Sequence, residues 1–429
     1  MPLKIPLLFR IISTTFIFVA INLFGLYDFY RDGLFLVLNT FDFLLFSINI
    51  IFFYVVIKSQ KFRIFIKQKP LRYILYIYLF TLLVFISMPF RGSISILDAA
   101  RVGRHYLILP LAFMVYYDVV LNNKFKYYFK IFRFIALFTS FQIIINAINP
   151  EIINFLFKDI GRAEAGVKGD YQRNVLLSPS MIFPHILSIY YFFKIITEKY
   201  KSSNLFLFFL LLFAGALQGF RVYFLILVLV LLIITVVFGR IHRKIFKWGL
   251  IFLFIIPTTI YLDSNILNNQ ILGKFYTSYN EIKFGTGSYQ VRMYDVSIRQ
   301  IPMLLEKPLF GWGFIYHNSK YGKQLNIPEE NARQYGLYSV DSGYITILMQ
   351  YGLIGVLLIL FWYFKMFVSL YKNRHNNLPI HLTSIGIIVL LVLSLYTHGA
   401  FFREFGLVPL TIMIGLTGGR FMSHNNNIT

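Results

Sequence analysis

The sequence contains no cysteine and has few charged residues, particularly acidic ones. Without cysteine the chain can form neither a disulfide nor a thiolate nucleophile. Charged residues make up 14% of the chain and hydrophobic residues 58%, whereas about a quarter of a soluble domain is charged. One water-soluble core cannot bury such an excess of apolar surface. The composition therefore indicates a chain that lies in lipid.

The short motifs of several enzyme classes are also missing. The chain has no phosphate-binding glycine loop and no His-Glu-x-x-His zinc motif. It has no Gly-x-Ser-x-Gly nucleophile elbow either. Its eight histidines are scattered, without a pair at the spacing of metal ligands. We therefore expect neither a metal ion nor a cofactor.

Apolar runs of about 17–25 residues recur along the chain, which is the length that crosses a bilayer core. Backbone groups in lipid must bond to one another, so each run predicts a helix. The short alternating segments of a β-barrel do not occur, and no cleavable signal peptide is evident. The sequence predicts an all-α, polytopic transmembrane bundle of about twelve spans. The expected spans are 11–27, 34–57, 73–90, 106–121, 134–148, 179–196, 205–219, 222–238, 249–262, 343–370, 382–399 and 406–419.

Many of the basic residues lie in short loops that follow every second span. Short cytoplasmic loops are enriched in Lys and Arg, so we expect both termini in the cytoplasm. This pattern accounts for part of the net charge of +23, and we expect no nucleic-acid partner. The loop residues are Lys58, Lys61, Arg63, Lys67, Lys69, Arg72, Lys124, Lys126, Lys130, Arg133, Lys199, Lys201, Arg240, Arg243, Lys244, Lys247, Lys372 and Arg374.

Two longer polar segments fall on the opposite side, at about 149–178 and 263–342. The second contains several glycines and prolines, which predict turns, and a helix is expected over Tyr289–Leu305, limited or kinked by Pro302. A loop of this length is usually functional. The expected domains are 1–262 with nine spans, 263–342 as a large, partly helical outer loop, and 343–429 with three spans and a short tail.

Arg221 lies between two strongly apolar runs, at or just inside the membrane boundary. An arginine there is costly unless it faces a polar cavity or a partner, or extends its head to the interface. Arg292 and Arg299 are spaced to share one helix face. These two arginines form either a solvated face or a second anion clamp, because guanidinium groups bind phosphate in a bidentate manner.

The large loop ends in two recognisable stretches. Residues 307–313 read Lys-Pro-Leu-Phe-Gly-Trp-Gly, a turn in which the tryptophan is expected to anchor at the membrane interface. Asp341 begins the stretch Asp-Ser-Gly-Tyr and is either a helix N-cap or a carboxylate that accepts a proton. Tyr344 ends this stretch and is a candidate for contacting a glycan. Gly352 and Gly355 are expected to let another helix approach closely.

Other basic residues make the predicted outer face electropositive, which suits an anionic lipid or a lipid diphosphate. Each of them is individually expected to anchor a helix at the interface. These residues are Arg91, Arg101, Arg104, His105, Arg162, Arg173 and Arg403.

The order of these features resembles the superfamily of O-antigen ligases and O-antigen polymerases, which are bacterial membrane glycosyltransferases. An arginine opens a span at Arg221, a large outer loop carries Arg292, and the stretches at 307–313 and 341–355 follow. The motifs cover about 205–370, whereas the first two hundred residues match only in hydropathy and number of spans.

The resemblance implies a site at the periplasmic face of the bacterial inner membrane that needs no nucleotide sugar, metal or cofactor. The substrates would be glycans on undecaprenyl diphosphate, and membrane lipids and a chain-length regulator would be further partners. Carried over to this chain, Arg221 and Arg292 would bind the diphosphate. The ligases have a histidine where this chain has Asp341, and His317 lies too far before the span to replace it. This departure favours a repeat-unit polymerase.

Four alternatives stay open. A ligase would transfer the glycan to the lipid A core. A flippase or other transporter would show charged spans, internal symmetry and short outer loops. A peptidoglycan glycosyltransferase of the shape-and-division type also has a large outer loop and a functional aspartate, but no wider motif agrees. A non-enzymatic scaffold would leave the outer arginines unexplained.

Overall fold

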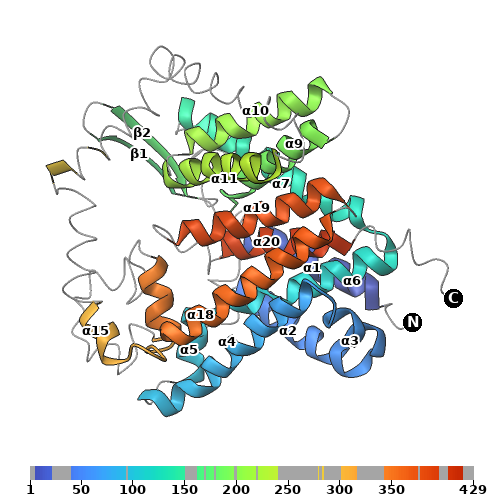
Figure 1. Ribbon diagram of the computed structural model, residues 1–429, viewed down its shortest axis with the longest axis vertical. Coiled ribbons are helices and arrows are strands. Elements are labelled where there is room, and N and C mark those ends of the chain that lie inside the picture. The colour runs from blue at the N-terminus through green and yellow to red at the C-terminus, as the bar shows by residue number, and fades with distance from the viewer. Residues whose placement is uncertain are drawn as a thin grey trace.

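The computed structural model describes a bundle of helices and one small hairpin (Figure 1). The described residues are 5–21, 40–92, 95–149, 162–168, 171–177, 180–197, 201–218, 221–239, 279, 283–284, 301–315, 343–374, 377–395 and 404–418. In chain order the elements are α1 (Ile5–Ala20), α2 (Thr40–Lys58), α3 (Gln60–Ile66), α4 (Leu71–Gly92), α5 (Ile96–Gly103), the 3-10 helix η2 (Arg104–Ile108), α6 (Pro110–Asn122), α7 (Phe125–Ile148), β1 (Arg162–Lys168), β2 (Tyr171–Leu177), α9 (Phe183–Thr197), α10 (Ser202–Leu217), α11 (Arg221–Gly239), α15 (Ile301–Glu306), α18 (Gly343–Lys372), α19 (Leu378–Ser394) and α20 (Glu404–Leu416).

The prediction of a polytopic helical membrane protein is confirmed. Each predicted span overlaps a helix, except 249–262, which lies outside the described residues. Helices in the described part that are long and apolar enough to cross a membrane are Thr40–Lys58, Leu71–Arg91, Arg104–Asn122, Phe125–Ile148 and Gly343–Lys372. Shorter apolar helices are Leu7–Ala20, Ser202–Leu217, Tyr223–Ile233, Leu378–Ser394 and Gly406–Leu416.

The structure adds an antiparallel hairpin that the all-α prediction missed. Strands β1 and β2 pair from Arg162 opposite Leu177 to Lys168 opposite Tyr171. The two residues between the strands are Gly-Asp, a sequence typical of a two-residue hairpin turn. Both strands fall inside the predicted outer segment 149–178. Hydropathy did not reveal them, because a short hairpin in a polar segment contains no apolar run of spanning length.

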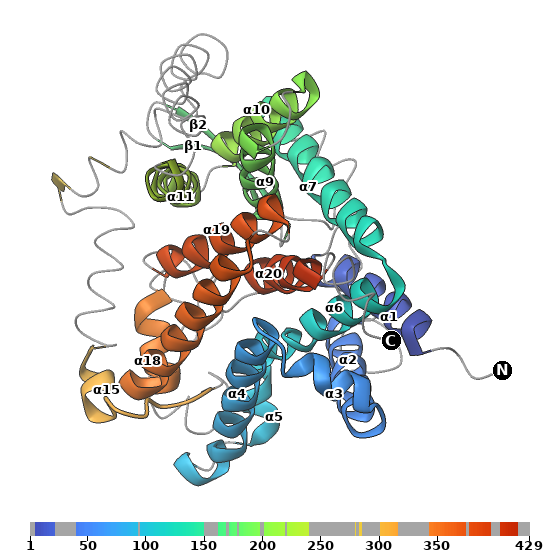
Figure 2. The same ribbon diagram turned by 45° about the vertical axis from the view of Figure 1, so that its right-hand side comes forward.

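The bundle has buried central helices and outer helices with one exposed apolar face. Helices α6, α9, α19 and α20 are buried along nearly all of their described length, and α20 lies between α6 and α19 (Figure 2). By contrast, α2, α4 and α18 expose large apolar side chains such as Ile57, Leu83 and Phe364. In water such surfaces would be costly. We therefore assign them to lipid contact.

Two ion pairs connect helices. Each pair joins two helix ends that the basic loops predict to lie on the same side of the membrane. Arg104 of η2 donates from one guanidinium nitrogen to both carboxylate oxygens of Asp42, at 2.9 and 3.0 Å, and both residues belong to predicted outer ends. Arg10 of α1 makes a two-bond pair with Asp118 of α6, at 2.9 and 3.0 Å, and both belong to predicted inner ends. The packing thus groups these helix ends as the charge pattern predicted.

Candidate functional site

Helix α18 is interrupted at Gly352, where φ is 66° and ψ is 179°. The residues on either side are helical, so α18 consists of two pieces, 343–351 and 353–372. A break removes the helical hydrogen bonds across it, which frees carbonyl groups on the first piece and N–H groups on the second. In lipid these groups must find other partners within the protein.

The stretch Lys307–Ile315, here called the docking segment, supplies those partners. It runs beside the break and exchanges backbone hydrogen bonds with both pieces of α18. Gly352 was predicted to let another helix approach, but a non-helical stretch of the large loop takes that place. The bonds are Trp312 N to Met349 O at 2.6 Å, Gly313 N to Gln350 O at 3.1 Å, Leu353 N to Pro308 O at 2.8 Å and Ile354 N to Leu309 O at 3.1 Å.

Two glycines make this close approach possible. Gly311 has φ 63° and Gly352 has φ 66°, in the left-handed region that residues with a Cβ rarely adopt. A Cβ at Gly311 would lie 2.5 Å from the Gly352 nitrogen, and a Cβ at Gly352 would overlap the Leu309 carbonyl. Gly355, one turn later, packs against the ring of Phe80 on α4, as the prediction of a helix contact required.

Phe314 fixes the end of the docking segment inside the bundle. It is fully buried and stacks on Phe85 of α4, with ring centroids 4.6 Å apart. Its ring also meets Tyr106 of η2 and, edge-on at 5.5 Å, Tyr351 of α18. Tyr351 hydrogen-bonds to Thr81 of α4 at 3.1 Å. The docking segment is therefore anchored to elements that are far apart in the sequence.

Trp312 is buried in protein rather than anchored at the membrane interface, so that prediction was wrong. The side chain is 5% exposed, and its indole N–H donates to the carbonyl of Met303 in α15 at 2.7 Å. The ammonium of Lys307 lies 4.0 Å from the centre of its ring, a cation–π contact. The tryptophan thus connects α15 to the docking segment and holds Lys307 in place.

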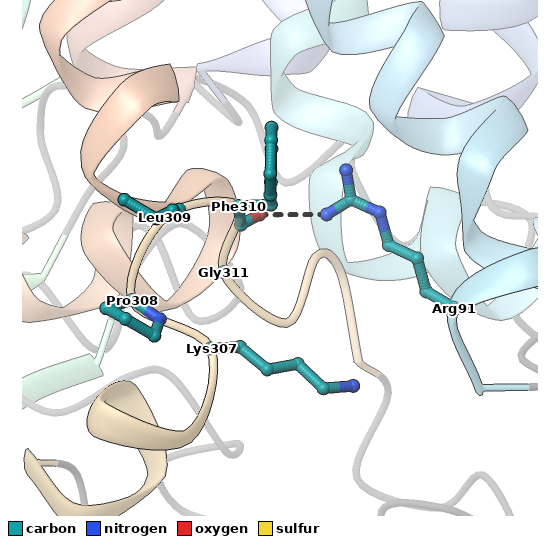
Figure 3. Close-up of a pocket in the computed structure, with 6 residues that line it drawn as sticks. All are labelled: Arg91, Lys307, Pro308, Leu309, Phe310 and Gly311. Atoms are coloured by element: carbon teal, nitrogen blue, oxygen red, sulfur yellow. Dashed lines mark hydrogen bonds between the residues drawn. The ribbon is translucent and has the colours of Figure 1, made fainter.

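A surface pocket of about 460 Å³ opens between α4 and the docking segment. It is lined by Arg91, Lys307, Pro308, Leu309, Phe310 and Gly311. Figure 3 shows Arg91 reaching from α4 across to the docking segment, where its guanidinium donates to the Phe310 carbonyl at 2.9 Å. Lys307 comes from the opposite wall. Two cationic side chains therefore line one pocket.

A second group of polar side chains is buried at the ends of α7, α9 and α10. Gln142, Asn146, His185 and Gln218 are each at most 2% exposed. Within the described part of the chain, each has at least one buried polar atom without a hydrogen-bond partner. Buried polar groups in a membrane protein are costly and usually functional. We call these four residues the polar layer.

The polar layer lies next to the start of α11. The His185 imidazole fits against Gly215, where a Cβ would be 3.2 Å from Nε2. Gln218 follows one turn later, and α11 begins three residues after it at Arg221. The last turns of α7 and α10 pack together through an apolar cluster at this level. The polar layer therefore lies at the ends of α7, α9 and α10 that are next to the start of α11.

The structure describes only some of the predicted site residues. Arg221 opens α11 at the predicted place, although its side chain is outside the described part. Arg292, Arg299 and Asp341 also lie outside the described residues. Tyr344 stands in the first turn of α18, is 41% exposed, and its N–H donates to the carbonyl that follows α19, at 2.9 Å. In the described part no three His, Asp or Glu side chains gather to hold a metal ion.

Two features were missed by sequence analysis. The sequence predicts Arg91 only as an interface anchor and Lys307 only as part of a turn. The polar layer had a visible signal, because Gln142, Asn146 and Gln218 interrupt otherwise apolar runs. The pairing of Arg91 with Lys307 had none, since 216 residues separate them and only the docking segment brings them together.

The segment from α10 to the second piece of α18 contains most of these features. Residues 204–360 match the model of the family described as O-antigen ligase. This segment resembles the O-antigen ligases. The resemblance inferred from the motifs is thereby confirmed for 204–360, here called the ligase-like segment. No curated protein gives a significant match to the chain. The chain is thus an integral membrane protein in which residues 204–360 are similar to the family described as O-antigen ligase.

Proposed function

We propose that this protein is a polysaccharide repeat-unit polymerase at the periplasmic face of the inner membrane. It transfers a growing glycan from undecaprenyl diphosphate to a sugar hydroxyl of a lipid-linked repeat unit. The observation that carries the proposal is the ligase-like segment, because Arg221, Arg292 and Asp341 all fall inside it. The aspartate at a position where the ligases have histidine favours the polymerase.

The arginines act on the leaving group. When the glycosidic bond to the lipid diphosphate breaks, negative charge grows on the leaving oxygen. Arg221 and Arg292 stabilise that charge through bidentate, charge-assisted hydrogen bonds. Cations held in place before the reaction stabilise the transition state more than the ground state. Losing one such donor costs about 3 kcal/mol, or roughly 100-fold in rate.

Asp341 is the proposed general base. It takes the proton from the acceptor hydroxyl as that oxygen attacks the anomeric carbon. One direct displacement inverts the anomeric centre. NMR analysis of the polymer and of its lipid-linked repeat unit tests this step, and a linkage of unchanged configuration would exclude direct displacement.

The polar layer supports a glycan site next to Arg221. Amide and imidazole side chains both donate and accept hydrogen bonds, which suits sugar hydroxyls. Gln142, Asn146, His185 and Gln218 carry buried polar atoms that no described residue satisfies. A sugar or ordered water at the start of α11 would complete these bonds.

A ligase is the second candidate, because the matching family is described by that activity. It would use the same arginines but transfer the finished glycan to the lipid A core. A flippase would move the lipid-linked unit without forming a bond. The three functions predict different accumulating species, so they can be separated in one strain.

The test is the surface glycan profile of a deletion strain, complemented with wild type, Arg221→Ala, Arg292→Ala or Asp341→Ala. A polymerase leaves a single repeat unit on the lipid core in the deletion strain, and the three variants make at least about 100-fold less polymer. Arg374→Ala is the matched control, since it removes an arginine from the predicted cytoplasmic end of α18. It is expected to make normal polymer.

Other outcomes decide between the alternatives. Loss of surface glycan with accumulation of long lipid-linked chains identifies a ligase. Accumulation of single units in the cytoplasmic leaflet identifies a flippase and removes the roles given to the three residues. Normal polymer from all three variants, at wild-type protein level, would exclude these residues from the site while leaving the activity open.

A further inference from the structure

The pocket between α4 and the docking segment carries positive charge that no acidic side chain neutralises in the described structure. Arg10 and Arg104 are both paired with carboxylates at 2.9 Å. By contrast, Arg91 donates to the Phe310 carbonyl, and Lys307 lies on the Trp312 ring. Among the described residues neither cation forms an ion pair. Both are held by the protein and can receive an anion.

Apolar side chains beside these cations are strongly exposed. Phe90 precedes Arg91 and is 88% exposed, and Leu305 and Phe310 are 70% and 61% exposed. In a membrane protein such side chains contact lipid tails. A ligand with a phosphate head and a long apolar chain would satisfy both features, because its head meets two cations and its tail stays in lipid.

This pocket is separate from the start of α11. Arg91 ends α4, and Lys307 follows α15, whereas Arg221 opens α11. Figures 1 and 2 both show α11 beside α9 and α19, whereas α15 lies beside α18, and α19 lies between α11 and α4. One diphosphate cannot bind at both places. Arg91 and Lys307 therefore lie on other elements than Arg221.

A repeat-unit polymerase needs two lipid-linked substrates at once. The donor loses its diphosphate, and the acceptor keeps its own. Arg221 and Arg292 are assigned to the donor because charge develops there during the reaction. The acceptor's diphosphate requires a cationic site that binds without activating a leaving group. Arg91 and Lys307 fit this requirement, since each is held by a contact within the protein.

We propose that Arg91 and Lys307 bind the diphosphate of the acceptor lipid, an inference that rests on the proposed polymerase function. The docking segment connects this site to the helix that begins near Asp341, because its backbone is hydrogen-bonded to both pieces of α18 at the break. The first piece of α18 then extends about 13 Å, at 1.5 Å per residue, back to its start, two residues after Asp341. Sugars on the acceptor would follow this helix toward the general base.

The experiment measures binding of radiolabelled undecaprenyl diphosphate to the full-length protein in phosphatidylcholine nanodiscs. The test variant is Arg91→Gln with Lys307→Gln. Glutamine is uncharged and keeps a hydrogen-bond donor at both positions, so the change removes the two charges while keeping polar side chains. We expect two saturable sites in wild type. The variant is expected to weaken one of them by roughly tenfold or more, while Arg221→Gln weakens the other.

The chain offers a matched control at the far end of α18. Arg374 also donates to a backbone carbonyl at 2.9 Å and lies over a tyrosine ring. Lys365 lies 5.1 Å from the ring centre of Phe361. The double variant Arg374→Gln with Lys365→Gln removes the same two charges from comparable contacts. It is expected to leave both binding sites unchanged.

Each other result has a definite meaning. Unchanged binding by the Arg91 and Lys307 variant overturns the acceptor site, and a weaker site in Arg221→Gln leaves the proposed function intact. Equal competition by phosphatidylglycerol at the Arg91 site identifies a site for bulk anionic lipid and also overturns the proposal. If the glycan profile excludes a polymerase while the Arg91 site still binds the probe, the acceptor role fails together with the proposed function.

Discussion

At the residue scale, arginines differ by their partners rather than by their positions in sequence. Arg10 and Arg104 form ion pairs that join helices, whereas Arg91 donates to a loop carbonyl beside a pocket. The sequence alone predicted that outer arginines are candidates for anion binding. It could not separate these roles, because the partners lie 62 to 219 residues away. Arg221 was predicted at the start of its helix because apolar runs flank it on both sides.

Asp118 is a buried carboxylate that is expected to need its partner Arg10 for stability. It is fully buried and accepts bonds from Arg10 and from Asn122. Removing one partner of a buried pair leaves an unpaired charge and costs about 3–5 kcal/mol. Arg10→Met leaves this buried carboxylate without its cation and is therefore expected to lower the melting temperature of the detergent-solubilised protein sharply. The double variant Arg10→Met with Asp118→Leu is expected to regain most of the loss, and a double variant as unstable as the single one would contradict this account.

Gly352 is expected to tolerate no side chain. Its φ of 66° and its contact with the Leu309 carbonyl both exclude a Cβ. Gly352→Ala should therefore destabilise the protein by about 1–3 kcal/mol and loosen the docking segment. Thermal unfolding followed by size-exclusion chromatography measures the change. Leu353→Ala is the control, because the neighbouring side chain is 47% exposed, and an equal effect of both variants would contradict the argument.

At the element scale, hydropathy predicted helices well and their interruptions poorly. The predicted span 343–370 agrees closely with α18 (Gly343–Lys372). Its break at Gly352 was not predicted, because a single glycine in an apolar run is equally typical of close helix packing. The deciding contacts come from the docking segment, which is about forty residues earlier. The hairpin β1–β2 had a local signal in its Gly-Asp turn.

The docking segment is expected to detach when its aromatic anchor is shortened. Phe314 is fully buried among rings from α4, η2 and α18, so Phe314→Ala creates a cavity that costs about 3–5 kcal/mol. Faster cleavage within Lys307–Ile315 in limited proteolysis would report the detachment. Phe310→Ala removes a 61% exposed ring from the same segment and is expected to cleave at the wild-type rate. Equal cleavage of both variants would contradict the anchor role.

At the scale of the whole molecule, composition and loop charge predicted the bundle and the grouping of its helix ends. Each of the two ion pairs joins two helix ends that the basic loops predict to lie on the same side of the membrane. Sequence could not predict which helices form the centre, since the buried α6 is less apolar than the lipid-facing α2. Burial of a membrane helix depends on shape and small residues more than on hydrophobicity.

The absence of cysteine makes the orientation directly measurable, because the native chain gives no thiol background. Ile96 in α5 is 53% exposed and lies at a predicted outer end, whereas Lys61 in α3 is exposed in a predicted cytoplasmic loop. In intact spheroplasts a membrane-impermeant maleimide is expected to label Ile96→Cys at once. It should label Lys61→Cys only after lysis, because the bilayer blocks the charged reagent.

The reverse labelling would place the pocket at Arg91 on the cytoplasmic side. A periplasmic transfer reaction would then be excluded together with the acceptor site, since both need the docking segment to face outward. Labelling of both positions before lysis would indicate leaky spheroplasts, which a cytoplasmic marker enzyme detects. With that control intact, the labelling of two single-cysteine proteins decides the orientation on which the proposed chemistry depends.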